Sequence, residues 1–225
     1  VSNDVIDATK FKSECIQPGT EGLIPNRNVS VGNEDCLYLN IYIPKNQTDI
    51  NKNKFPVMFW IHGGSNIWGS GDFYDFSKLA TTQQVIVVTI NYRLGLFGWF
   101  SSEHLRNTAT GLDKSSNFGQ LDLIKGLEWV QENISAFGGD KNNVTIFGES
   151  AGCHNVLTLL ASPLSDGLFH KAISQSGYVS SYTQKFAEEE SELSSKKIFA
   201  EDTKFLVSDA EVADYLRSLS SEEVY

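Results

Sequence analysis

A serine with a glycine two positions before it and another two positions after it is typical of enzymes in which the serine attacks a carbonyl carbon. Gly148, Ser150 and Gly152 fit the pattern G-x-S-x-G, in which the serine lies on a sharp turn between a strand and a helix. The apolar residues 144–147 predict that strand, and residues 151–161 predict that helix. Because the glycines let neighbouring backbone approach closely, the Ser150 hydroxyl is expected to project above a sheet.

A second motif, the tetrapeptide HGGS at residues 62–65, directly follows the apolar run 56–61. When a serine attacks a carbonyl carbon, negative charge gathers on the oxygen, and each well-placed backbone N–H stabilises it by about 3 kcal/mol. One such donor follows the nucleophile, and others come from a loop after an earlier strand. We therefore expect Gly64, Ser65 and Ala151 to be the donors. Taken alone, the HGG tripeptide is better interpreted as a plain tight turn, and its place ahead of the serine motif is what favours the role as donor.

The elements that must position these residues follow an alternating pattern. Short β-branched and aromatic runs alternate with amphipathic stretches, which is typical of a mostly parallel sheet flanked by helices on both faces. The predicted strands are residues 37–43, 56–61, 85–91, 144–147 and 171–174. The predicted helices are residues 74–83, 118–137, 151–161 and 210–219. In the second helix, one apolar stripe at spacings of three and four faces the sheet. Its members are Leu121, Ile124, Leu127, Val130 and Ile134.

The amino-acid composition limits the classes of partner that the chain can bind. The 225 residues are 40% hydrophobic, as in a soluble globular protein with a large core. The formal net charge of −10 argues against a nucleic-acid partner, since a basic face is needed to displace counterions. The apolar runs are far shorter than the roughly 18 residues of a membrane-spanning helix, so no membrane span is predicted. We interpret the acidic run at residues 188–192 as solvated surface.

Five stretches that cover most of residues 15–177 resemble the type-B carboxylesterase and cholinesterase family. They read EDCLYLNIYIP, PVMFWIHGGSN, INYRLGLFGWF, NFGQLDLIKGLEWVQENISAFGGDKNNVTIFGESAG and LFHKAISQSG. The resemblance implies an α/β-hydrolase fold, incomplete in this chain, and a serine carboxylesterase that forms an acyl-enzyme on Ser150. The substrate would be a small-molecule ester, and no metal or organic cofactor is implied.

The resemblance also assigns supporting roles. It implies that Ser176, in the QSG motif, supports the catalytic carboxylate, and that Arg93 and Asp140 form a buried ion pair. Ser65 stands where the family most often has glycine or alanine, so its hydroxyl is expected to narrow the acyl side of the site. Apart from the resemblance, Glu149 is adjacent to the nucleophile, and we predict that it is buried and tunes the site electrostatically.

Cys15 and Cys36 bracket a segment rich in Pro, Gly and Asn, which is typical of a closed loop. The cysteine count alone leaves a disulfide open. The resemblance implies a Cys15–Cys36 disulfide, because the family closes a loop with the cysteine of its EDCL motif. Such a bond implies an oxidising compartment, so we predict a secreted or periplasmic location. The third cysteine, Cys153, is predicted to be an inert buried thiol.

The sequence offers no convincing general base for Ser150. The four histidines lie in the oxyanion loop, in a polar loop, one turn past the nucleophile and before a strand: His62, His104, His154 and His170. In α/β-hydrolases the chain order is nucleophile, acid, histidine. We therefore expect both partners beyond Tyr225, in the remainder of the same enzyme, and expect the isolated chain to be inactive.

Two further interpretations concern organisation and function. Residues 1–180 are predicted to form the core α/β-hydrolase portion, and residues 181–225 a helical segment that starts a cap or a second subdomain. The alternative function is a catalytically silent binding or adhesion relative of the same fold. A lipase or thioesterase would differ only in its acyl and leaving-group pockets. Four apolar side chains either line a gorge or pack in the core: Ile67, Trp68, Phe73 and Phe97.

Overall fold

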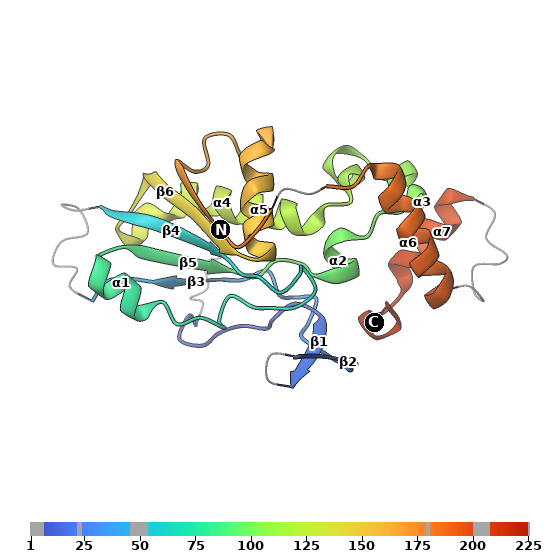
Figure 1. Cartoon of the computed structure of the whole chain (residues 1–225), viewed down its shortest axis with the longest axis horizontal. Coiled ribbons are helices and arrows are strands. Elements are labelled where there is room, and N and C mark those ends of the chain that lie inside the picture. The colour runs from blue at the N-terminus through green and yellow to red at the C-terminus, as the bar shows by residue number, and fades with distance from the viewer. Residues whose placement is uncertain (1–6, 22–23, 46–53, 179–180, 200–207, 225) are drawn as a thin grey trace.

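The computed structural model describes residues 7–21, 24–45, 54–178, 181–199 and 208–224. Its centre is a five-stranded sheet of order β3-β5-β4-β6-β7 (Figure 1). The strands are β3 (Leu39–Tyr42), β4 (Phe55–Ile61), β5 (Ile86–Ile90), β6 (Gly139–Glu149) and β7 (Lys171–Gln175). The β3–β5 pair is antiparallel and the other three pairs are parallel. The mostly parallel sheet that the sequence predicts is thus confirmed.

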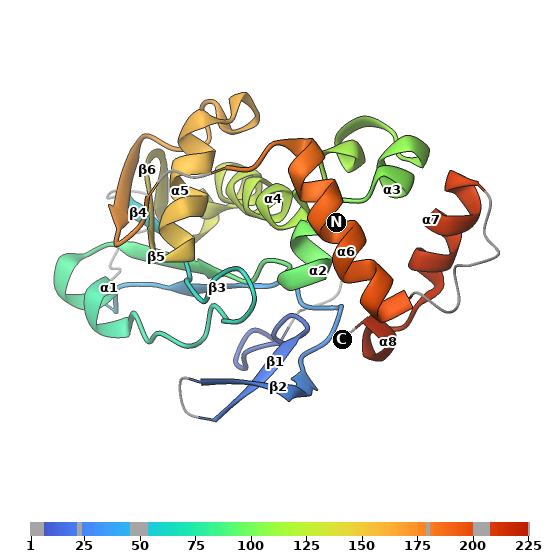
Figure 2. The same ribbon diagram turned by 45° about the vertical axis from the view of Figure 1, so that its right-hand side comes forward.

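Helices cover both faces of this sheet. The helices α4 (Phe118–Asn133) and α5 (Ala151–Ala161) lie on one face, and α1 (Ser77–Gln83) lies on the other (Figures 1 and 2). Alternate residues of β4 supply the two cores, because successive side chains of a strand point to opposite faces. Phe59 belongs to the large core beneath α4 and α5, whereas Trp60 packs with Ala80 of α1.

Shorter helices complete this part of the chain. They are α2 (Gly95–Trp99), α3 (Glu103–Thr108) and three 3₁₀ helices at Gly111–Ser115, Ile134–Phe137 and Pro163–Ser165. The helix predicted at residues 118–137 is therefore α4 followed by a 3₁₀ turn. Both end before Gly138, which has a φ of 82°, a left-handed conformation that glycine adopts without strain.

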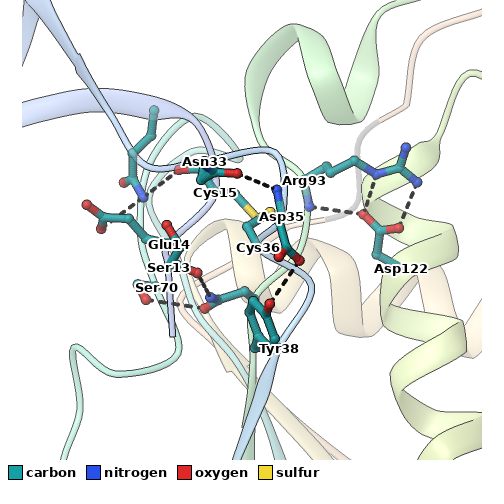
Figure 3. The surroundings of a disulfide bond; sticks show 12 residues. Ser13, Glu14, Cys15, Asn33, Asp35, Cys36, Tyr38, Ser70, Arg93 and Asp122 are labelled. Carbon is teal, nitrogen blue, oxygen red and sulfur yellow. Dashed lines mark hydrogen bonds and ion pairs between the residues drawn. A yellow bond between two sulfur atoms is a disulfide. The ribbon is translucent and has the colours of Figure 1, made fainter. Parts of the chain in front are cut away.

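The segment between the first two cysteines is a closed loop, as predicted, and it contains a β-hairpin that its turn-forming residues did not indicate. The strands β1 (Gln17–Glu21) and β2 (Ile24–Val31) pair antiparallel, with an irregularity between Pro18 and Gly19. Several of the turn-forming residues lie within these strands, and the pairing is interrupted between two of them. The predicted Cys15–Cys36 disulfide is present at the base of this hairpin (Figure 3).

Replacement of both cysteines by serine is expected to lower the free energy of unfolding by about 3 kcal/mol, since the bond closes a loop of 21 residues. Urea denaturation followed by circular dichroism measures the change. Treatment of the wild-type protein with a thiol reductant is expected to produce the same loss. An unchanged denaturation midpoint in the double variant would contradict the prediction.

Arg93 pairs with Asp122 of α4, so the predicted Arg93–Asp140 ion pair is wrong. The Arg93 backbone N–H and two guanidinium nitrogens donate to the Asp122 carboxylate at 2.7 to 3.0 Å (Figure 3). Asp140 instead accepts the backbone N–H of Asn142. Arg93 follows the carboxyl end of β5, whereas Asp140 opens β6. In a parallel sheet these positions lie at opposite ends of the strands.

The described residues after β7 form three helices, and the second of them packs beside α3, as Figure 2 shows. They are α6 (Gln184–Phe199), α7 (Asp209–Ser218) and α8 (Ser221–Val224). The Ser208 side chain accepts the N–H of Glu211, and the Glu211 carboxylate accepts the N–H of Ser208. This capping box begins the helix that the sequence predicts at residues 210–219. The division of the chain at about residue 180 stays a prediction.

Polar contacts join these helices to α3. His104 lies on α3 and not in a loop, and its Nδ1 is 2.7 Å from Asp209. Arg106 donates to Glu188 at 2.7 Å, and this hydrogen bond lowers the pKa of the Glu188 carboxyl. Glu188 is therefore not simply solvated, as the acidic run suggested.

Candidate active site

Ser150 occupies the turn between β6 and α5, with φ 55° and ψ −120°. A residue other than glycine held in a sparsely populated backbone region costs about 1–3 kcal/mol and persists only where its surroundings fix it. Here the Ser150 N–H donates to the Gln175 carbonyl at 2.9 Å, and the Ser150 carbonyl accepts the N–H groups of Cys153 and His154. Strand β7 and the first turn of α5 therefore hold the serine in its strained conformation.

The two glycines of the motif are required by close backbone packing. A Cβ on Gly152 would lie 2.1 Å from the Ile61 carbonyl oxygen, and one on Gly148 would lie 2.6 Å from the backbone of Gly152. Both separations are shorter than real Cβ contacts. Any side chain at either position would push α5 away from β4, and the serine would move with it.

The loop after β4 turns sharply against the serine. Gly64, Ser65 and Asn66 all have positive φ, at 98°, 58° and 57°. A Cβ on Gly64 would lie 1.9 Å from the Trp68 carbonyl oxygen, so this position requires glycine. A Cβ on the preceding Gly63 would lie 3.3 Å from the Ser150 Cβ. The tetrapeptide is thus a tight turn and also a wall next to the nucleophile.

A cleft of about 240 Å³ brings four of the predicted site residues together: Glu149, Ser150, Gly64 and Ser65. The other residues that line it are His62, Gly63, Trp68, Gly69, Phe73 and Tyr74. Glu149 is half-buried rather than buried. An acyl group placed in this cleft would contact the serine, the glycine-rich turn and an aromatic wall.

Two predicted residues are not among those that line the cleft. Ala151 is buried at the first position of α5, where backbone N–H groups have no partner within the helix. Ser176 is exposed and follows β7 with a φ of 57°, next to the Gln175 carbonyl that accepts the Ser150 N–H. Both assignments therefore stay predictions.

The four aromatic and aliphatic candidates for a gorge divide between two surfaces. Trp68 and Phe73 line the cleft, whereas Phe97 lines a separate pocket between α2 and α7. Ile67 is exposed. Tyr74 also lines the cleft, although no sequence motif includes it. Its position directly after Phe73 was the available signal.

His62 is buried beneath the loop and is held as a neutral ring. Its Nδ1 lies 2.8 Å from the Gly63 carbonyl oxygen, and the ring stacks on Tyr92 at 4.3 Å between centroids. Burial lowers the pKa of His62 to about 4, against 6.5 for the free side chain. Below pH 6.5 the unfolded chain therefore takes up a proton that the folded protein does not accept until about pH 4.

This difference predicts an acid-sensitive fold. Between pH 7 and pH 4, His62 is expected to lower the free energy of unfolding by about 3 kcal/mol. The measurement is denaturant unfolding of the wild type and of His62→Asn at several pH values. The variant is expected to lose about 3 kcal/mol less over this interval, and equal losses in both proteins would show that His62 does not titrate as predicted.

The other three histidines also have contacts of their own. His104 pairs with Asp209, and the His170 Nδ1 accepts the N–H of Val144. His154 lies edge-on to Tyr178. Among the hydrogen bonds of the described residues, none joins a histidine to the Ser150 hydroxyl. In the same part of the chain, no group of three His, Cys, Asp or Glu side chains is arranged to hold a metal ion.

Gln17 fixes the far end of the glycine-rich loop. Its side-chain amide donates to the Gly69 carbonyl at 3.0 Å and accepts the Gly69 N–H at 2.7 Å. Gln17 is almost fully buried and opens β1, two residues after Cys15. The loop that lines the cleft is therefore tied to the hairpin that the disulfide closes.

Fold and site together define the class of the protein. A serine on a strained turn between a parallel strand and a helix, beside a glycine-rich turn, is the arrangement of an α/β-hydrolase. Residues 2–225 match the sequence profile described as the Carboxylesterase family. The chain belongs to that family, which confirms the resemblance found in the sequence.

Individual relatives support the assignment. The chain is 47% identical to para-nitrobenzyl esterase of Bacillus subtilis (strain 168) over 189 residues, which cover 83% of this chain and 37% of that protein. It is 46% identical to carboxylesterase 1E of Rattus norvegicus over 183 residues, 77% of this chain and 31% of that protein. A solved PNB esterase structure matches with a TM-score of 0.80 and 38% identity, over 98% of this chain and 42% of that one. The chain spans about a third of the length of the two named relatives.

Proposed function

We propose that this chain is the nucleophile-bearing part of a serine carboxylesterase. The observation that carries the proposal is Ser150, held at a strained turn in a cleft that it shares with Gly64 and Ser65. A strained residue that faces a cleft has a cost that packing alone does not explain. Membership in the carboxylesterase family supports an ester as the substrate.

The proposed reaction proceeds through an acyl-enzyme. A histidine base takes the proton of the Ser150 hydroxyl as Oγ bonds to the ester carbonyl carbon. The N–H groups of Gly64, Ser65 and Ala151 stabilise the negative oxygen of the tetrahedral intermediate. The intermediate then breaks its bond to the alcohol oxygen, which receives the proton. Water hydrolyses the acyl-enzyme by the same sequence, which releases the acid and restores the serine.

The base and its carboxylate partner lie outside the 225 residues in this proposal. Each histidine of the chain has a contact other than Ser150, and the named relatives are more than twice as long as the chain. The remainder of the same enzyme is then a required partner, and the isolated chain is inactive. A burst of p-nitrophenol from p-nitrophenyl acetate that the isolated chain catalyses, and that Ser150→Ala abolishes, would contradict this part of the proposal.

Covalent labelling tests the nucleophile directly. A fluorophosphonate bonds to the oxygen of an activated serine with loss of fluoride, so the full-length protein is expected to carry the label on Ser150 in a peptide mass spectrum. Ser162→Ala, which removes a serine just beyond α5, serves as the control and is expected to label normally. If the folded protein takes no label, the catalytically silent binding relative becomes the better interpretation.

The substrate is proposed as a small ester of an aromatic alcohol. A relative that is 47% identical carries the name para-nitrobenzyl esterase, and three aromatic side chains line the cleft: Trp68, Phe73 and Tyr74. Hydrolysis of p-nitrobenzyl acetate by the full-length protein, compared with that of ethyl acetate, tests the preference. Glu149 is proposed to tune the site electrostatically, and Ser176 is proposed to support the catalytic carboxylate.

We also propose that the protein works in an oxidising compartment, secreted or periplasmic. The buried Cys15–Cys36 disulfide supports this, because such bonds persist where thiols are not kept reduced. Among the described residues no helix has the length and apolar character needed to cross a membrane. The net charge of −10 gives no support for a nucleic-acid partner.

A further inference from the structure

Asn66 is the strained residue at the end of the turn that lines the cleft. Its φ of 57° continues the positive values of Gly64 and Ser65, and two of these three residues carry a Cβ. For residues other than glycine this region costs about 1–2 kcal/mol each, although asparagine tolerates it better than most. A turn of this kind keeps its shape only if neighbouring groups hold it.

The group that holds the Asn66 side chain comes from α5, the helix that follows Ser150. The Asn155 Nδ2 donates to the Asn66 Oδ1 at 2.9 Å, while the Gly95 N–H donates to the Asn66 carbonyl at 2.7 Å. Asn155 is only 3% exposed, and it lies five residues after Ser150 on the same helix. One rigid element thus carries both the nucleophile and the contact that fixes the opposing turn.

The surroundings of Asn155 leave little freedom for its amide. The Gln120 Nε2 of α4 donates to the Asn155 carbonyl at 3.3 Å, and the Asn155 side chain faces the Tyr92 hydroxyl. That hydroxyl donates to the His62 carbonyl at 2.6 Å, directly before the glycine-rich turn. Asn155 therefore lies among groups that fix both ends of the turn, at His62 and at Asn66.

We infer that Asn155 is a positioning residue for the oxyanion hole. By binding Asn66 it fixes the direction of the Gly64 and Ser65 N–H groups relative to Ser150. The inference rests on the proposed function, because the turn has this role only if Ser150 forms an acyl-enzyme. Since the N–H groups bind the charged oxygen and not the ground-state ester, a displaced turn slows the reaction without weakening substrate binding.

The test uses Asn155→Ala, Asn66→Gly and the double variant in the full-length protein. Glycine accepts the backbone conformation of Asn66 and removes only the amide. Each single variant is expected to lower kcat about tenfold, with KM within about twofold of the wild type. The double variant is expected to be no slower than the slower single variant, because both remove the same hydrogen bond. A trifluoromethyl ketone, which forms a charged tetrahedral adduct with the serine, is expected to bind the single variants about tenfold more weakly.

Val156→Ala is the matched control, since it changes the next residue of the same helix and shortens a side chain buried in the core. It is expected to lower the thermal midpoint while kcat stays within about twofold of the wild type. Unchanged kcat in Asn155→Ala, an equal loss in Val156→Ala, or losses that multiply in the double variant would each overturn the inference. Failure of the wild type to react with a fluorophosphonate would instead overturn the proposed function. If Asn155→Ala does not fold, Asn66→Gly alone decides through kcat and the ketone affinity.

Discussion

Replacement of Ser150 by alanine is expected to lower kcat of the full-length protein by on the order of a million-fold, the scale of loss that removal of a catalytic serine produces. The variant loses the only atom that bonds to the acyl carbon in the proposed reaction. The serine has an unusual backbone conformation, but the surrounding hydrogen bonds involve its main chain, which alanine retains. The fold is therefore expected to survive. Steady-state hydrolysis of p-nitrophenyl acetate, together with a thermal melt, measures both properties.

Thr158→Ala is a suitable control for this variant. Thr158 lies on α5, is exposed, and bonds only within the helix to the His154 carbonyl. Its loss is expected to leave kcat within about twofold of the wild type. Residual activity of Ser150→Ala above one per cent of the wild type, in a protein free of wild-type contamination, would show that another group is the nucleophile.

Gly64→Ala is expected to lower kcat by about 100-fold to 1,000-fold, the scale of losing an oxyanion donor. An added Cβ would lie 1.9 Å from the Trp68 carbonyl oxygen, which is rigid backbone, and φ is 98°. The turn must therefore move, and the Gly64 and Ser65 N–H groups move with it. The measurement is kcat and KM of the purified variant, with the thermal midpoint recorded to confirm folding.

Gly167→Ala separates the effect of the clash from that of the backbone conformation. Gly167 also has a positive φ, 77°, but a Cβ there would meet no atom within 4 Å. This variant is expected to lose some stability and to keep its kcat. If Gly64→Ala retains wild-type kcat, the Gly64 N–H is not a donor to the oxyanion. Other groups must then form the oxyanion hole.

Much of the sheet could be predicted from the sequence because its strands are buried on both faces. Strand β5 is completely buried, and such a strand appears as a continuous apolar run between polar turns. The hairpin β1–β2 could not be predicted in the same way. Its residues include Pro18, Gly19 and Pro25, which favour turns, and the pairing depends on the disulfide and on packing beyond the local sequence.

The ion pair of Arg93 shows a second limit of prediction from the sequence, which is the choice of partner for a charged side chain. Several carboxylates were available to this arginine, and the sequence does not encode which one lies at the same end of the sheet. The correct partner, Asp122, lies in the second turn of α4 and is nearly buried. On a helical wheel Asp122 lies on the opposite side from the apolar stripe that includes Ile124 and Leu127, so periodicity carried no signal that Asp122 is buried.

The residues of the candidate site also divide into those that the sequence could predict and those that it could not. Ser150, Gly64 and Ser65 could be placed together because short motifs encode their backbone conformations. The residues that hold them could not be found, since Gln17 and Asn155 act through contacts 52 and 89 residues away in the chain. A polar residue in a mostly apolar helix, such as Asn155 within α5, gives no indication of its partner.

The tie between Gln17 and Gly69 has a consequence for redox chemistry. Cleavage of the Cys15–Cys36 bond would free the base of the hairpin that presents Gln17, and the amide pair that fixes Gly69 would loosen. A glutathione-rich environment would then act on the turnover of the enzyme as well as on its stability. The hairpin would thus link the oxidation state of two sulfur atoms to the loop that lines the cleft of the proposed esterase.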